Sequence, residues 1–250
     1  MTAGFGLTDV GRRRSHNEDA YLIDDDRGLY VVADGVGGHA KGEVASAEAV
    51  EQIQNWVIRH ETLVAEYLAA PSEERLYPLR RMVESGVQAA CYLIHSMAQL
   101  EPDRKGMSTT ISMALVLGKT VIIGQVGDSR VYLLRQGVAT QITEDHTLIN
   151  YKLKHGLITP EQAARAPGKN VITRAVGHLD YVEVDVTNLV AEPHDRFLLC
   201  SDGLHGYLQP GEIEQHGVGD QASACRAFID LANGRGGKDN ITVVMVDIGV

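Results

Sequence analysis

The sequence predicts an α+β fold whose strands pair mainly antiparallel. Short apolar runs rich in Val, Ile, Leu and Tyr recur along the 250-residue chain, and Gly, Asp and Asn bound them as they bound strands. The runs at 110–118 and 120–127 are separated only by Lys119, so these neighbours must turn back on each other. Helical segments interrupt the runs as a block and do not alternate with every strand, which indicates α+β rather than a parallel α/β sheet.

The individual elements follow from their periodicity. Strands are predicted at residues 20–24, 29–33, 110–118, 120–127, 130–135, 196–201 and 241–248. Amphipathic helices are predicted at residues 42–58, 78–98 and 220–232, because apolar side chains recur there at helical spacing. Pro78 suits the first turn of the second helix. No linker or low-complexity tract divides the chain, so residues 1–250 are predicted to form a single domain.

Composition excludes several classes of function. The formal net charge of −10 makes nucleic acid an unexpected partner, because affinity for it depends on clustered Lys and Arg. Cys91, Cys200 and Cys225 are widely spaced in apolar runs, which favours free buried thiols over disulfides or a zinc site. The first residues lack the apolar core of a signal peptide, and no apolar run reaches the ~20 residues that cross a bilayer. We therefore expect a cytoplasmic protein without a membrane anchor.

Aspartates adjoin five of the predicted strands. The residues concerned are Asp19, Asp34, Asp128, Asp202 and Asp239. A single Asp-Gly pair is ordinarily a turn, but strand ends and starts share one edge of an antiparallel sheet, so the recurrence predicts that these carboxylates converge. Carboxylates crowded together repel unless they are protonated or neutralised by cations. Ligands that are all oxygen suit hard ions, so the sequence predicts a Mg²⁺ or Mn²⁺ site.

The residues around Asp34 fit this site. Asp34 has two oxygens and can bridge two cations, and Gly35, without a Cβ, can bring its carbonyl close as a further ligand. Two ions roughly 4 Å apart polarise a shared water for in-line displacement at phosphorus. Arg14 is predicted to hold the phosphate, because a planar guanidinium binds two phosphate oxygens.

Seven short motifs carry a family resemblance that covers nearly the whole chain. They are RSHNEDA (14–20), ADGVGGHAKGE (33–43), MSTT (107–110), VGDSRVY (126–132), TEDH (143–146), CSDGL (200–204) and KDNITVV (238–244). Each motif is weak alone, but together and in this order they resemble the metal-dependent Ser/Thr protein phosphatases of the PPM, or type 2C, family in its compact bacterial form.

The resemblance implies a fold, an activity and partners. The fold would be a β-sandwich of two mainly antiparallel sheets with helices on both outer faces and the metal site at one end. The polar segment 146–175 would be the family's flap, bordering the substrate channel. The activity would be hydrolysis of phosphoserine and phosphothreonine in proteins by a water or hydroxide that bridges two Mn²⁺ or Mg²⁺ ions. A cognate bacterial Ser/Thr kinase system is the expected partner, and a monomer is the expected state.

The resemblance also implies a role for each site residue. Asp34 would bridge the two core ions, the Gly35 carbonyl would bind one of them, and Asp202 and Asp239 would bind the other. Asp128, together with Asp202, would hold a third ion. Glu18 and Asp19 would position water on the ions, and Arg14 would grip the phosphate. Three further residues would support the surrounding structure: Ser108, Thr109 and Asn240.

The proton donor to the leaving group is left open by the sequence. Many eukaryotic relatives place a histidine after the Asp-Gly pair, where this chain has Val36. The nearest imidazole is His39, so a metal-bound water and His39 are both candidates for the general acid.

Three alternatives were weighed against this interpretation. Residues 35–40 satisfy the loose dinucleotide-binding pattern, but Asp34 would repel a pyrophosphate, and 51–70 is predicted as helix where a second strand is required. A cysteine-based phosphatase needs an arginine six residues after its cysteine, and none of the three cysteines has one. The third alternative is a catalytically weak phosphopeptide-binding module on the same fold, although every acidic position of the pattern is filled.

Overall fold

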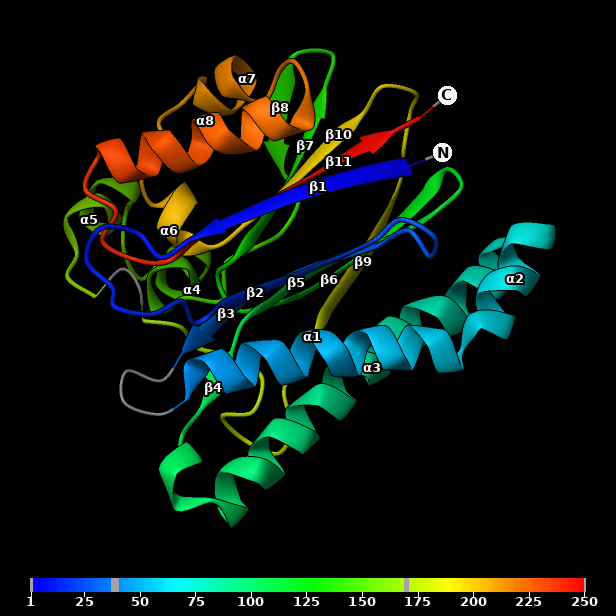
Figure 1. Ribbon diagram of the computed structural model, residues 1–250, viewed down its shortest axis with the longest axis horizontal. Helices are drawn as coiled ribbons and strands as arrows, with labels where there is room; N and C mark the ends of the chain where they lie inside the picture. Colours follow the sequence, from blue (N-terminus) through cyan, green and yellow to red (C-terminus); the bar gives the residue numbers. More distant parts are fainter. Residues whose placement is uncertain (1, 37–40, 169–170, 250) are drawn as a thin grey trace.

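The structure is a computed structural model that describes residues 2–36, 41–168 and 171–249, and it consists of two facing sheets (Figure 1). The first sheet has the strand order β1 (Thr2–Asp9), β11 (Ile241–Ile248), β10 (Arg196–Cys200), β7 (Arg130–Arg135) and β8 (Val138–Gln141). The second has the order β2 (Asp19–Asp24), β3 (Leu29–Val36), β5 (Ile111–Leu117), β6 (Thr120–Val126) and β9 (Asp185–Val190), with β4 (Ser108–Thr109) beside β3. The named strands pair antiparallel throughout, as the sequence predicts.

Helices cover the outer face of each sheet (Figure 1). The second sheet packs against α1 (Gly42–Arg59), α2 (Glu61–Ala69) and α3 (Glu73–Leu100). The first sheet packs against α6 (Asp202–His205), α7 (Glu212–His216) and α8 (Gln221–Gly234). A short 3₁₀ turn, Pro102–Arg104, follows α3. The predicted α+β sandwich with helices on both outer faces is therefore confirmed.

Alternation along the strands builds the layer between the sheets. In β3, Leu29 and Val31 pack toward the helices, whereas Tyr30 and Val32 pack toward the opposite sheet. Phe197 and Val244 meet them from the first sheet. Successive side chains of a strand point to opposite faces. Every second residue of a strand therefore faces the layer between the sheets, and this alternation determines which residue lies at the end of that layer.

The sequence did not predict β1, β8 or β9. In β1, Gly4 and Gly6 lower the apparent strand propensity, yet their packing requires glycine. A Cβ on Gly4 would lie 2.4 Å from Cε1 of Tyr30, and a Cβ on Gly6 would lie 2.7 Å from Cε2 of Tyr21. β8 and β9 are partly exposed strands at the edges of their sheets, without a continuous apolar run.

The second predicted helix begins earlier than expected. Ser72 caps α3 by accepting a hydrogen bond from the backbone N–H of Arg75, and the helix starts at Glu73. Pro78 therefore lies inside the helix and not in its first turn, which corrects the prediction. Its missing N–H removes one hydrogen bond close to the N-terminal end, where the helix tolerates the loss.

The segment 146–175, called the flap segment below, leaves the sandwich between β8 and β9. It contains α4 (Leu148–Lys154) and α5 (Pro160–Arg165). Its two ends are joined at a neck, where Thr147 and Ile172 form an antiparallel bridge and the N–H of Thr173 donates to the carbonyl of His146. The segment is thus an excursion from the sandwich whose two ends meet at the neck.

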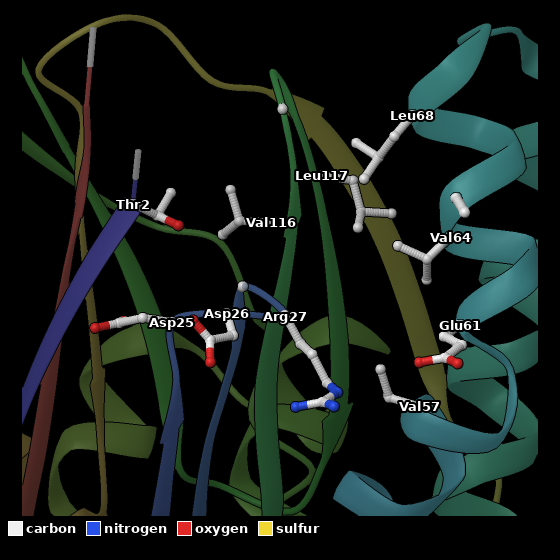
Figure 2. A pocket seen from close by; sticks show the side chains of 13 residues that line it. Thr2, Asp25, Asp26, Arg27, Val57, Glu61, Val64, Leu68, Val116 and Leu117 are labelled. Carbon is white, nitrogen blue, oxygen red and sulfur yellow. The ribbon is translucent and has the colours of Figure 1, made fainter.

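A hollow of about 440 Å³ lies between α2 and the turns that join β2 to β3 and β5 to β6 (Figure 2). Its charged lining includes Asp26, Arg27 and Glu61, and its apolar lining includes Val64 and Leu117. It lies at the end of the sandwich near the N-terminus, away from the predicted aspartates. No helix in the described part of the chain is both long and apolar enough to span a bilayer.

We predict that Phe197→Ala lowers the free energy of unfolding by about 3–5 kcal/mol, the usual effect of truncating a fully buried phenylalanine. Phe197 is 0% exposed between the two sheets. Urea denaturation followed by circular dichroism measures the change. Leu100→Ala is the control, because Leu100 is 81% exposed at the end of α3. Equal losses in the two variants would contradict the assigned core.

Candidate active site

Two aspartates face each other across β2 and β3 at one end of the sandwich. Asp19 and Asp34 are direct partners in the antiparallel register. Asp34 has the same parity as Tyr30 and Val32, so its side chain closes the inter-sheet layer where the apolar side chains stop. Two carboxylates are therefore held side by side in a place that the strand pattern would otherwise fill with hydrophobic residues.

Hydroxyl groups from the opposite sheet hold Asp19. Its Oδ2 accepts hydrogen bonds from Ser201 Oγ at 2.8 Å and Thr242 Oγ1 at 2.6 Å. Its Oδ1 is buried without a hydrogen-bond partner in the described structure. A buried carboxylate oxygen without a donor is unfavourable, and this atom indicates that the site is completed by a group that binds oxygen.

The backbone around Asp34 and Gly35 is tightly enclosed. The Asp34 N–H donates to Thr110 Oγ1 at 3.0 Å, and the Gly35 N–H donates to the Glu18 carbonyl at 3.1 Å. A Cβ on Gly35 would lie 2.4 Å from the carbonyl oxygen of Gly42 and 2.5 Å from that of Glu18. Glycine is required here because β3 and the start of α1 approach closely.

Three more predicted aspartates reach the same end of the sandwich from other elements. Asp202 is the first residue of α6, one residue after β10, and its charge raises the pKa of Asp34. Asp128 is buried in the turn between β6 and β7, and Asp239 lies just before β11. The charge of each of the three acts on Asp34, so the structure brings together the carboxylates that the sequence singled out. We call Asp19, Asp34, Asp128, Asp202 and Asp239 the carboxylate site.

Crowding and burial shift the acidities of this site. Burial, followed by the charge of Asp19 and Asp202, raises the pKa of Asp34 well above its ordinary value. Burial raises the pKa of Asp19 to about 7, although the hydroxyls of Thr242 and Ser201 oppose the shift. Burial and the charge of Asp202 raise the pKa of Asp128 to about 7, and burial and Asp239 raise that of Asp202 to about 6. The site is therefore a strong attractor for protons or for cations.

Arg14 lies at the exposed rim of the site. Its Nη2 donates to Asp239 Oδ2 at 2.8 Å, and its Nη1 lies 3.9 Å from Glu18 Oε2. The hydrogen bond with Asp239 raises the pKa of the guanidinium further. The side chain is 42% exposed, so one face of this cation is open to a ligand.

The remaining predicted residues support the main chain around the site. Asn240 accepts from the Glu18 N–H at 2.9 Å and donates to the carbonyls of Val10 and His16, both at 3.0 Å. Thr109 Oγ1 donates to the Asp34 carbonyl at 2.9 Å, and Ser108 Oγ donates to the Val36 carbonyl at 3.3 Å. His39, the candidate general acid, lies outside the described residues.

The donor set fits hard divalent cations. It consists of carboxylate oxygens with a backbone carbonyl nearby, which is the chemistry that Mg²⁺ and Mn²⁺ prefer. Among the described residues, the one group of three ligating side chains with atoms all within 4.8 Å is a different set, His16, Glu18 and Glu43. Arg14 lies 3.9 Å from Glu18, and Lys41 lies 3.5 Å from Glu43, so cationic side chains already offset this group.

Sequence reasoning missed the hydroxyl groups that hold the carboxylates. The hydroxyls of Ser201 and Thr242 donate to Asp19. Thr110 Oγ1 accepts from the Asp34 N–H and lies 2.7 Å from Ser129 Oγ. The alternation of inward-facing and outward-facing residues along the strands could have revealed these hydroxyl groups. Ser201 and Thr242 continue the inward positions of their strands, after Leu199 and before Val244, and so mark where the apolar layer ends.

All three cysteines are free and buried. Burial raises the pKa of Cys200 and that of Cys225 to about 12, and it also raises the pKa of Cys91. These thiols therefore stay protonated and unreactive near neutral pH, in agreement with the rejection of a cysteine-based phosphatase.

We predict that the metal-free protein becomes less stable as the pH rises from about 5 to about 8. Asp19, whose pKa is about 7 in the folded protein and ordinarily 3.8, binds its proton more tightly when folded, so the folded state loses relative stability as the pH passes from the lower to the higher value. Since one pKa unit corresponds to about 1.4 kcal/mol, the free energy of unfolding should fall by at least about 1 kcal/mol.

Urea denaturation in EDTA across this pH range measures the effect. Asp19→Asn should flatten the pH dependence, because the amide keeps an acceptor for Ser201 and Thr242 but does not titrate. A free energy of unfolding that rises steadily from pH 5 to 8 would show that the carboxylates are not strained in this way.

Comparisons with known proteins agree with the fold and the motifs. The family model described as protein phosphatase 2C matches residues 10–235. The serine/threonine phosphatase stp of Listeria innocua is 37% identical over 246 residues, which are 96% of this chain and 93% of that protein. The crystal structure of the Mycobacterium tuberculosis serine/threonine phosphatase PstP/Ppp superposes with a TM-score of 0.87 at 34% identity, covering 100% of this chain and 99% of that one.

A second solved structure bears on the metals. It is the catalytic domain of the phosphatase PstP in complex with two manganese ions, and it matches with a TM-score of 0.83 at 33% identity, covering 100% of this chain and 99% of that one. The family model spans most of the chain, and relatives above 30% identity span nearly all of it. The chain therefore belongs to the protein phosphatase 2C family.

Proposed function

We propose that this protein is a divalent-metal-dependent phosphatase that hydrolyses phosphoserine and phosphothreonine in other proteins. The observation that carries the proposal is the carboxylate site itself, in which the buried Asp128 and the half-buried Asp19 and Asp34, all with raised pKa, converge beside the partly exposed Arg14. Family membership and the named phosphatases among the relatives support the reaction class. The sheet that contains β1 and β11 joins the two ends of the chain, which supports our proposal that residues 1–250 act as a single phosphatase domain with 146–175 as its flap.

Different residues of the carboxylate site would hold different cations. Asp34 and the Gly35 carbonyl, with Asp202 and Asp239, would hold two ions of Mn²⁺ or Mg²⁺, and Asp128 with Asp202 would hold a third. Bound there, the ions would supply a hydroxide at neutral pH and neutralise charge on the phosphate. Asp19 and Glu18 would orient water within the site, and the unpartnered Oδ1 of Asp19 is suited to that task.

Arg14 would bind the phosphate from the open side of the site. Its guanidinium is fixed by Asp239 and still partly exposed, so it can donate to two phosphate oxygens without a large rearrangement. Catalysis would then depend on positioning and charge neutralisation, since the buried thiols provide no nucleophile. His39 stays a hypothesis for the proton donor.

The partners follow from the reaction. Phosphorylated proteins are the proposed substrates, and a Ser/Thr kinase whose products this enzyme reverses is the proposed counterpart. We also propose that the protein acts as a monomer in the cytoplasm.

The principal experiment is a phosphopeptide hydrolysis assay with Mn²⁺, Mg²⁺, Ca²⁺ and EDTA. We expect phosphate release with Mn²⁺ or Mg²⁺ and none with EDTA. The alternative is a phosphopeptide-binding module without catalysis. It would be favoured if the Mn²⁺-loaded protein bound phosphopeptide but failed to hydrolyse it and also failed to hydrolyse p-nitrophenyl phosphate.

We predict that Asp34→Asn lowers kcat by at least about a hundredfold, comparable with the loss of one well-placed electrostatic group in other active sites. The asparagine amide carries no negative charge, so it would hold the cations less tightly than the aspartate carboxylate does. Steady-state kinetics at saturating Mn²⁺ tests this, with Asp230→Asn as the control because Asp230 is exposed on α8. Retention of most of the wild-type kcat by Asp34→Asn would exclude the proposed bridging role.

We predict that Arg14→Ala acts mainly on substrate binding and raises KM by about tenfold or more, because a charge-assisted hydrogen bond to phosphate contributes about 1.5–3 kcal/mol. Arg13→Ala is a matched control from the same basic triplet, since Arg13 is exposed and forms no ion pair with a described residue. An unchanged KM in Arg14→Ala, or an equal increase in both variants, would count against phosphate binding by Arg14.

A further inference from the structure

His146 is a buried residue that the proposed mechanism does not use. It ends the motif TEDH (143–146), begins the flap segment and is only 7% exposed. Both of its ring nitrogens have partners, one in the turn that carries Asp128 and one on β9. A buried imidazole with such defined contacts has a structural task, and the contacts indicate which one.

The first set of contacts fixes one residue of the turn between β6 and β7. The Gly127 N–H donates to His146 Nδ1 at 3.1 Å, and the His146 N–H donates to the Gly127 carbonyl at 2.9 Å. Gly127 has φ of +99°, and a Cβ there would lie 2.5 Å from Cγ2 of Thr110. His146 thus holds both polar groups of a glycine whose backbone conformation other residues rarely adopt.

The next residue is Asp128, and its direction depends on this backbone. No side chain among the described residues forms a hydrogen bond with the Asp128 carboxylate. Its own carbonyl accepts from His205 Nε2 at 2.9 Å, and His205 belongs to α6, which begins with Asp202. The main chain of Asp128 is therefore held on one side by His146 and on the other by His205, while its carboxylate is free to bind a cation.

The second set of contacts defines the tautomer and the connection to the flap segment. Because the Gly127 N–H donates to Nδ1, that nitrogen carries no proton, and the proton of the neutral ring lies on Nε2, which faces Asp185 Oδ2 at 3.2 Å. Arg174 Nη1 also lies 3.1 Å from Nε2, but a protonated Nε2 cannot accept a hydrogen bond from it. Arg174 binds Asp185 Oδ1 at 2.7 Å and Glu183 at 2.7 Å, which keeps Asp185 in place. Burial lowers the pKa of His146, consistent with a neutral ring.

We infer that His146 is a positioning residue for cation binding. Through Nδ1 it fixes the N–H of Gly127, and through its backbone N–H it fixes the Gly127 carbonyl, which belongs to the Gly127–Asp128 peptide, so that the Asp128 carboxylate faces Asp202. Through its own carbonyl it ties this turn to the neck of the flap segment. The inference rests on the proposed function, in which Asp128 and Asp202 share a cation. It assigns His146 no contact with substrate and no part in proton transfer.

Two conservative variants separate the two ring nitrogens. In His146→Asn the amide lies about where Nδ1 was and can accept from Gly127. In His146→Gln the amide reaches the position of Nε2 and can contact Asp185, but nothing replaces Nδ1. Titration calorimetry with Mn²⁺, without substrate, measures the affinity of the weakest Mn²⁺ site. The Asp128→Asn variant serves as the reference isotherm for a protein in which that site is lost.

We expect His146→Gln to weaken the weakest Mn²⁺ site about tenfold or more, since a buried N–H of the turn is left unpaired, and His146→Asn to stay within about threefold of wild type. In the Asp128→Asn background, His146→Gln should have no further effect on Mn²⁺ binding. Equal loss in the Asn and Gln variants, additive losses in the double variant, or an unchanged isotherm in Asp128→Asn would each overturn the proposal.

A measurement on the wild-type protein does not depend on how well the variants fold. The imidazole ¹⁵N chemical shifts of His146 should identify Nδ1 as unprotonated and Nε2 as protonated, and the opposite tautomer would overturn the proposal. The readout also separates this inference from the proposed function. A protein with the expected Mn²⁺ isotherms but no phosphopeptide hydrolysis would contradict the function alone, whereas an active enzyme whose His146→Gln variant binds Mn²⁺ normally would contradict the role of His146 alone.

Discussion

The constraint on which the structure depends is the placement of several carboxylates at one end of an otherwise apolar layer. Strand alternation brings Asp34 and Asp19 into that layer, and neither can turn away without shifting the register of β2 against β3, whose first five residues are buried. The cost appears in the raised pKa of Asp19 and of Asp34. The three hydrophobic clusters must offset the free-energy cost of holding these carboxylates together. The carboxylates of the metal-free protein therefore reduce the stability of the fold, and the packed core maintains their positions.

Rigidity follows from where the carboxylates are attached. Asp19 and Asp34 belong to the paired strands β2 and β3, of which β2 lies at the edge of its sheet. Asp202 starts a helix just after the buried strand β10, and Asp239 directly precedes Asn240, which is fixed by three hydrogen bonds to the main chain. Ligands held in this way lose little conformational freedom when a cation binds. Electrostatic preorganisation of this kind is the main source of catalysis in sites without a protein nucleophile.

The sequence predicted what is encoded locally and missed what depends on distant pairs. Continuous apolar runs identified most of the strands, and aspartates adjoining five of these runs identified the site. The hydrogen bonds of Ser201 and Thr242 to Asp19 join residues 182 and 223 positions apart, and only the register of two sheets reveals them. β1 was missed for a related reason. Its glycines are required because aromatic rings on β2 and β3 pack closely against them, and those contacts are not visible in the local sequence.

The carboxylate site therefore has two kinds of ligand. Asp34 is fixed by its strand on both sides, so its position follows from the sandwich alone. Asp128 lies in a turn between β6 and β7, where a glycine with positive φ precedes it. The main chain of this turn is bound by Gln125 of β6 and also by His146 and His205 from other parts of the chain. One of those partners, His146, also forms the neck of the flap segment. The neck therefore contacts the residue that precedes Asp128, whereas Asp34 is linked to the end of the flap segment through Thr109, which binds both the Asp34 carbonyl and the main chain of Val176.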